Sequence, residues 1–205
     1  MLDFDLVREG SCFLWGARQT GKSTLLKILY PDALRYDLLR STEYRRFLHN
    51  PAVLREEILS PHRAEQIAKS PVLIDEVQKI PELLDEVHSV IEDAGVRFIL
   101  CGSSARKLKR GHANLLGGRA FRYELKPLVF PEVPDFDLTA ALNTGLLPRF
   151  YGSAHAIRMM QAYISDYLKE EIAAEALSRN IPAFNRFLEV AAISNGELIN
   201  YQNIA

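Results

Sequence analysis

Two stretches of the chain carry residue types that suit phosphate chemistry. Residues 16–24 read GARQTGKST, which matches the pattern G-x-x-x-x-G-K-[ST]. In that pattern glycines let backbone N–H groups turn inward around a phosphate, the lysine reaches the terminal phosphates and the hydroxyl ligates magnesium. The pattern predicts a nucleotide-phosphate site formed by Gly16, Ala17, Arg18, Gln19, Thr20, Gly21, Lys22, Ser23 and Thr24, with Ser23 on the metal.

The second stretch is PVLIDE at residues 71–76, an apolar run that ends in two acids. Such a strand can deliver Asp75 to the magnesium shell, while Glu76 orients and polarises a water for attack on the γ-phosphate. Small-molecule kinases need no water-activating glutamate, because their nucleophile comes from the substrate. The pair therefore favours hydrolysis, although an apolar strand ending in Asp-Glu is often only a polar strand end.

Three further residues are candidates for the reaction. Ser103 and Ser104 follow the apolar run RFILC, where a short polar side chain can reach the attacking water or the γ-phosphate. The alternative for either serine is to cap the N-terminus of a helix. Arg119, in Gly-Gly-Arg, could act as an arginine finger in a neighbouring subunit's site, or be one more surface arginine.

The elements that position these residues alternate along the chain. Apolar runs predict strands at 11–15, 33–39, 71–76, 97–100 and 121–128, and periodic patterns predict helices after the glycine loop and at 41–49, 50–59 and 81–94. The interval between Lys22 and Asp75 leaves room for one strand and two helices, so the loop strand and the acid strand are not consecutive. Alternating strands and helices predict an α/β fold with parallel βαβ units.

The C-terminal third has a different character. Residues 131–148 are rich in Pro, Asp and Gly, and we expect a linker at 134–153 between a core at 1–133 and a helical segment at 154–205. Helices are predicted at 156–178 and 183–193. The tail at 200–205 resembles the first turn of a helix, so the segment is expected to be incomplete.

Composition narrows the class of protein. The 205 residues are 48% hydrophobic and 25% charged, without a membrane-length apolar run or a secretory signal, so we expect a cytoplasmic protein with no membrane contact. Cys12 and Cys101 lie in apolar runs and are expected to be reduced core residues. The net charge of −1 argues against bulk attraction to nucleic acid, although a local basic stretch lies between Ser104 and Tyr123.

Taken with GARQTGKSTLLK, the segments LIDEVQKIPELL, ILCGSSARKL, LLGGRAFRYELKPLVFPE and YLKEEIA resemble the AAA+ superfamily of P-loop ATPases. The closer resemblance is to prokaryotic predicted ATPases in which a C-terminal domain of unknown function follows the core. It implies a three-layer α/β/α core with a five-stranded parallel sheet, ATP and Mg²⁺ as ligands, Asp75 and Glu76 as the acid pair, and Ser103 or Ser104 as a polar sensor. The tail would open a winged-helix-like module. One departure is GLLPR at 145–149, where the family often has Gly-Gly-Leu-Pro-Glu.

These observations lead to ranked functions. The first is a magnesium-dependent ATPase whose hydrolysis drives a conformational change acting on an unknown partner. The second is a nucleotide-dependent switch with little turnover that engages DNA or protein through its helical C-terminal segment. A small-molecule kinase is disfavoured by Glu76. A homo-oligomer built through Arg119 is a possible assembly.

Overall fold

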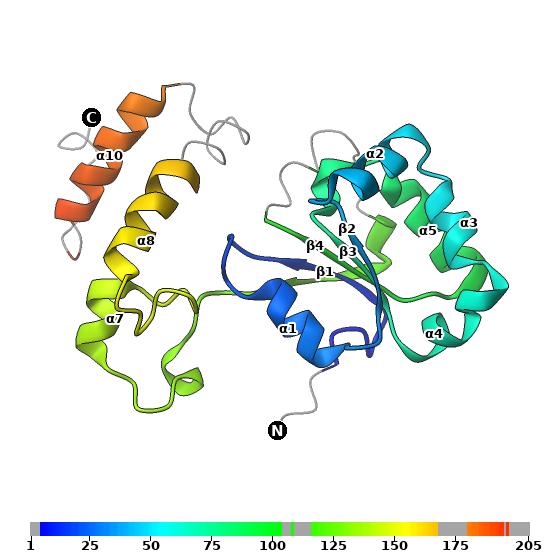
Figure 1. Cartoon of the computed structure of the whole chain (residues 1–205), viewed down its shortest axis with the longest axis horizontal. Coiled ribbons are helices and arrows are strands. Elements are labelled where there is room, and N and C mark those ends of the chain that lie inside the picture. The colour runs from blue at the N-terminus through cyan, green and yellow to red at the C-terminus, as the bar shows by residue number, and fades with distance from the viewer. Residues whose placement is uncertain (1–4, 104–107, 109–115, 168–179, 195, 197–205) are drawn as a thin grey trace. The chain divides into compact units, whose positions relative to one another are not determined.

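The computed structural model describes residues 5–103, 108, 116–167, 180–194 and 196 (Figure 1). The chain divides into two compact units. The first comprises Met1–Asp137 with Leu146–Arg149, and the second comprises Leu138–Gly145 with Phe150–Ala205. Each unit is described by itself below.

The first unit is built on a five-stranded parallel sheet in the order β2-β3-β4-β1-β5. The strands are β1 (Ser11–Trp15), β2 (Leu34–Asp37), β3 (Val72–Asp75), β4 (Phe98–Gly102) and β5 (Ala120–Glu124). The predicted α/β class and five-stranded parallel sheet are confirmed. Because all the strands run the same way, the segments that follow β1, β3 and β4 meet at one edge of the sheet.

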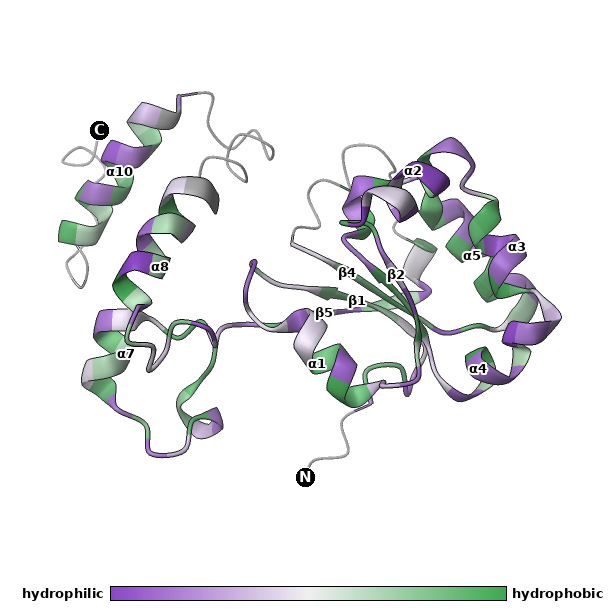
Figure 2. Cartoon of the chain, viewed as in Figure 1, coloured by the Kyte–Doolittle hydropathy of each residue, from purple (hydrophilic) through white to green (hydrophobic). Residues whose placement is uncertain are grey.

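Strands β1, β3 and β4 are buried on both faces, which explains why they read as continuous apolar runs, whereas the edge strand β5 is largely exposed. Phe13 and Trp15 pack in a large cluster with Phe47, Leu54 and Leu83, whereas Cys12 and Leu14 pack in a smaller one with Leu26. The side chains of alternate β1 residues thus point to opposite faces of the sheet. The central strands β1 and β4 are largely green in Figure 2. Both Cys12 and Cys101 are free and buried in the smaller cluster, and burial raises the pKa of Cys12 to about 12.

In the described part of the unit the sheet is flanked by α1 (Lys22–Leu29), α2 (Ser41–His49), α3 (Val53–Ile58), α4 (Ala64–Lys69) and α5 (Leu83–Ala94). Short 3-10 turns lie at Pro61–Arg63, Val77–Lys79, Leu116–Gly118 and Phe130–Glu132. Several predicted bounds differ by a few residues; for example, α3 begins two residues after Pro51 and β5 ends at Glu124. Helix α4 was not predicted. In α4 no residue is fully buried, so the segment lacks the apolar stripe by which sequence reveals a helix.

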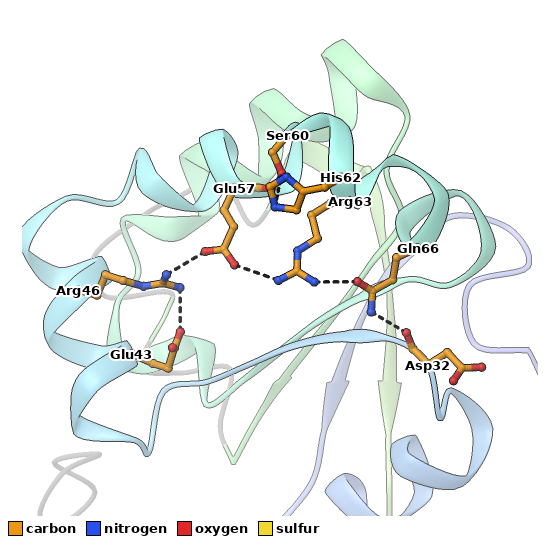
Figure 3. A network of polar contacts seen from close by, with 8 residues as sticks. All are labelled: Asp32, Glu43, Arg46, Glu57, Ser60, His62, Arg63 and Gln66. Atoms are coloured by element: carbon orange, nitrogen blue, oxygen red, sulfur yellow. Dashed lines mark hydrogen bonds and ion pairs between the residues drawn. The ribbon is translucent and has the colours of Figure 1, made fainter.

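A chain of polar contacts joins α2, α3 and α4 beside the sheet (Figure 3). Arg46 bridges Glu43 and Glu57 at 3.0 and 2.9 Å, and Glu57 also lies 3.7 Å from Arg63. This network of contacts continues because Gln66 accepts a hydrogen bond from Arg63 and donates one to the carbonyl oxygen of Asp32. The contacts tie the three helices to the segment that leads into β2.

The second unit is helical in its described part, as predicted. It contains α7 (Leu138–Thr144), α8 (Ala156–Ala162), a π-helical turn (Tyr163–Tyr167) and α10 (Ile181–Ile193). Helix α7 falls inside the segment 134–153 that we predicted to be a linker. The tail at 195–205, which the resemblance predicts to open a winged-helix-like module, lies outside the described residues except for Gly196. None of the described helices is long and apolar enough to cross a membrane.

Candidate functional site

The glycine loop follows β1 directly and leads into the first residue of α1. Lys22 is the first residue of that helix and is only 7% exposed. Its ammonium Nζ donates to the carbonyl oxygens of Gly16 (2.6 Å) and Ala17 (2.9 Å). The Thr20 hydroxyl also donates to the Ala17 oxygen, at 2.9 Å. The loop therefore closes around the lysine and holds a positive charge at the N-terminus of α1, where an anion is favoured.

Gly16 is required by a close approach between this loop and the segment after β5. Its φ is +155°, and a Cβ built there would lie 2.4 Å from the carbonyl oxygen of Leu125. The two backbones are held together because the Leu125 N–H donates to the Trp15 oxygen at 2.8 Å. Any side chain at position 16 would push them apart.

The glycine loop and the acid strand meet through one hydrogen bond. The hydroxyl of Ser23 donates to Oδ2 of Asp75 at 2.8 Å, across 52 residues of sequence. Hydroxyl and carboxylate oxygens are hard ligands that Mg²⁺ accepts, usually with substrate phosphates and water in the other positions. No group of three or more His, Cys, Asp or Glu side chains in the described part of the chain could hold a metal. The Ser23 hydroxyl and the Asp75 carboxylate fit a magnesium ion that binds together with phosphates.

Glu76 stands at a turn in the backbone where β3 ends. Its φ of +58° is in the left-handed region, which is rare for a residue with a side chain and is often found at functional sites. Burial and the neighbouring Asp75 carboxylate raise the pKa of Glu76. A hydrogen bond from Gln78 and the charges of Lys22 and Arg18 oppose that rise. The carboxylate thus lies within the electrostatic reach of the loop lysine.

Ser103 follows β4 and joins the same group of contacts. The amide Nε2 of Gln78 donates to Oε2 of Glu76 and, at 3.3 Å, to the hydroxyl oxygen of Ser103. Sequence reasoning did not identify Gln78. Its only sequence signal is its position two residues after the acid pair. The other candidate, Ser104, lies outside the described residues, as do the basic residues Arg106, Lys107, Lys109 and Arg110.

A cavity of about 640 Å³ opens over the loop and the acid pair, a size typical of small-molecule sites. Besides residues of both motifs it is lined by Leu39, Pro148 and Arg149, none of which was predicted. A hydrogen bond from the Leu128 N–H to the Leu146 oxygen, 2.9 Å long, anchors the segment that carries Arg149 to the first unit. The side chain of Pro148 then lies 3.8 Å from a Cβ built on Gly21.

Arg119 does not line this cavity. It lies just before β5, is partly exposed, and forms an ion pair with Glu92 of α5. Its predicted role in a neighbouring subunit's site stays a prediction.

A family model described as an AAA domain matches residues 8–134, and one described as a domain of unknown function (DUF8612) matches residues 136–205. No curated protein matches the chain.

Among solved structures, the Walker-type ATPase PABY2304 of Pyrococcus abyssi is 15% identical, with a TM-score of 0.51 over 92% of this chain and 80% of that one. At that identity the likeness shows a shared fold. The ORC2 protein of Aeropyrum pernix is 16% identical, with a TM-score of 0.40 over 97% of this chain and 72% of that one, which is too weak to carry an argument. The first family model covers more than half of the chain and spans the glycine loop, the acid pair and Ser103. The chain therefore belongs to the AAA domain family.

Proposed function

We propose that the chain binds ATP together with Mg²⁺ and hydrolyses the bond between the β- and γ-phosphates. The observation that carries this proposal is the hydrogen bond between Ser23 and Asp75, because it brings the glycine loop and the acid strand to a single point. Glu76, the next residue, is beside that point and within reach of the Lys22 charge. The residues proposed to bind phosphate, to hold the metal and to act as the base all line one cavity.

Each residue has a distinct task in this reaction. The loop N–H groups and Lys22 bind the phosphates and offset their charge. Ser23 and Asp75 would hold the magnesium ion, which neutralises charge that develops on the phosphate oxygens when it is bound. Glu76 accepts a proton from the attacking water as the water's oxygen bonds to the γ-phosphorus and the bond to ADP breaks. Ser103 supplies a polar contact at the same edge of the sheet.

The hydrolysis is proposed to drive a conformational change that acts on a partner. The second unit, which is helical in its described part, is the segment we propose to engage DNA or protein. Arg119 is proposed to complete a neighbouring subunit's site in a homo-oligomer. A switch with little turnover that engages DNA or protein is the alternative.

Phosphate release by wild type and a Glu76→Gln variant separates these functions. We expect Glu76→Gln to bind ATP normally and to lose about 100-fold to 10,000-fold in turnover, because the amide cannot accept the proton. Glu82→Gln, an exposed position beyond the acid strand, is the matched control and should behave as wild type. Equal, low release by wild type and Glu76→Gln would support the switch instead. A phosphorylated product other than free phosphate would indicate a kinase.

A further inference from the structure

One buried amide links the two strand ends that face the proposed reaction. The side chain of Gln78 is 8% exposed and lies in the turn that follows the acid pair. Its Nε2 donates both to Glu76 and to the hydroxyl oxygen of Ser103. These two partners come from β3 and β4, which are neighbours in the sheet.

The packing around Gln78 leaves its amide little freedom. A Cβ built on Gly102 would lie 2.2 Å from Oε1 of Gln78 and 2.7 Å from the ring of Trp15. The amide therefore fills the space that a side chain at position 102 would take. Because both Gln78 and Trp15 are buried, neither can move aside into solvent. The bare glycine is what allows the amide to reach Glu76.

The orientation of the amide also points to a role beyond packing. Its Oε1 is buried and has no hydrogen-bond partner among the described residues. A buried unpaired carbonyl destabilises a protein, and such groups are uncommon in native structures. The amide oxygen of Gln78 stays unpaired, while the amide nitrogen donates to the Glu76 carboxylate and to the Ser103 hydroxyl.

We propose that Gln78 is the positioning residue for Glu76. Its amide nitrogen holds Oε2 of the Glu76 carboxylate, which leaves the other carboxylate oxygen of Glu76 for the attacking water, and the same nitrogen ties that geometry to Ser103. This inference rests on the proposed ATP hydrolysis. A shift of Ser103 as the γ-phosphate binds or leaves changes the position of the shared amide, and the carboxylate follows. Phosphate contact and water activation are in this way coupled by one side chain.

Two variants remove the amide donor while keeping the bulk of the side chain. Gln78→Met replaces the amide with an apolar group of similar length, and Gln78→Glu keeps its shape but places a second carboxylate against Glu76. We expect either change to lower kcat about tenfold to 100-fold, the range for losing a hydrogen bond to a charged group. The dissociation constant for ATP should stay within about twofold, because Gln78 is not among the residues that line the cavity.

Gln66→Met is the matched control, since Gln66 lies on α4, its amide donates to the Asp32 carbonyl before β2, and it does not line the cavity. It should leave kcat unchanged. The double variant Gln78→Met/Glu76→Gln should be no slower than Glu76→Gln alone, because a positioning residue acts only through the group it positions. Thermal midpoints are measured for every variant, and Gln78→Glu decides the question if Gln78→Met fails to fold.

The possible outcomes distinguish a failure of the positioning role of Gln78 from a failure of the proposed ATP hydrolysis. If wild type releases phosphate and the Gln78 variants match its kcat, the positioning role is wrong and the ATPase proposal stands. A parallel loss of kcat and ATP affinity would also overturn it, because that pattern indicates a general disturbance of the site. No phosphate release by wild type would overturn the proposed function and this inference together.

Discussion

Replacing Gly16 with alanine tests how closely the glycine loop is built against its neighbour. The new Cβ would lie 2.4 Å from the Leu125 carbonyl oxygen, about 1 Å inside ordinary contact. Forcing such an atom into a packed region costs about 1–3 kcal/mol. The φ of +155° adds about 1–2 kcal/mol for a residue that carries a side chain. The expected loss in the free energy of unfolding is therefore about 3 kcal/mol in total.

Gly95→Ala isolates the backbone part of this cost. Gly95 has a φ of +63° at the end of α5, and a Cβ there would meet nothing within 4 Å. At about 3 °C per kcal/mol for a chain of this size, we expect the thermal midpoint to fall by about 10 °C for Gly16→Ala and about 4 °C for Gly95→Ala. ATP affinity should fall only for Gly16→Ala. Equal midpoints for the two variants would refute the close approach to Leu125.

Three further predictions follow from the site and its surroundings. Arg149→Ala should weaken ATP binding several-fold in equilibrium titration, because an exposed cation that lines the cavity is lost, and an unchanged affinity would remove it from the site. Ser23→Ala should lower ATP affinity about tenfold with magnesium present and little without it, whereas an equal loss in both conditions would argue against a metal ligand. Glu57→Gln should lower the thermal midpoint by about 3 °C, since Arg46 and Arg63 both face its carboxylate, while Glu65→Gln at an exposed pair should not. Equal midpoints for those last two variants would show that the contacts in Figure 3 contribute little.

The elements of the core could be predicted because their signals are local. Apolar runs buried on both faces identify β1, β3 and β4, and the glycine loop fixes where α1 begins. Helix α5 combines a buried apolar stripe with a closing Gly95, whose left-handed conformation is common after a helix. By contrast, α4 and α7 are short and contain no fully buried residue, so neither leaves a periodic pattern in the sequence. Composition therefore suggested a linker where the chain forms α7.

The candidate site likewise contains residues that the sequence could predict and residues that it could not. Lys22, Ser23 and Asp75 belong to motifs whose spacing is readable along the chain, and the structure brings Ser23 and Asp75 into contact. Gln78 was missed because its proposed role depends on tertiary contacts. Its amide reaches Glu76 and Ser103, and it packs against Gly102, where no side chain is in the way.

Arg149 was missed for a related reason. It reaches the cavity because a backbone hydrogen bond between Leu128 and Leu146 returns the chain to the core. Contacts between residues so far apart depend on tertiary packing, which a single sequence does not reveal.

Equilibrium binding of ATP with Mg²⁺ to wild type, Lys22→Ala and Lys27→Ala tests the central claim most directly. Both lysines lie on α1, but Lys22 is buried in the loop whereas Lys27 is exposed. Losing a charged contact to phosphate should weaken binding by about tenfold to 100-fold for Lys22→Ala, and Lys27→Ala should bind as wild type does. If all three proteins bind ATP with the same affinity, residues 16–24 do not form a phosphate site and the account is wrong.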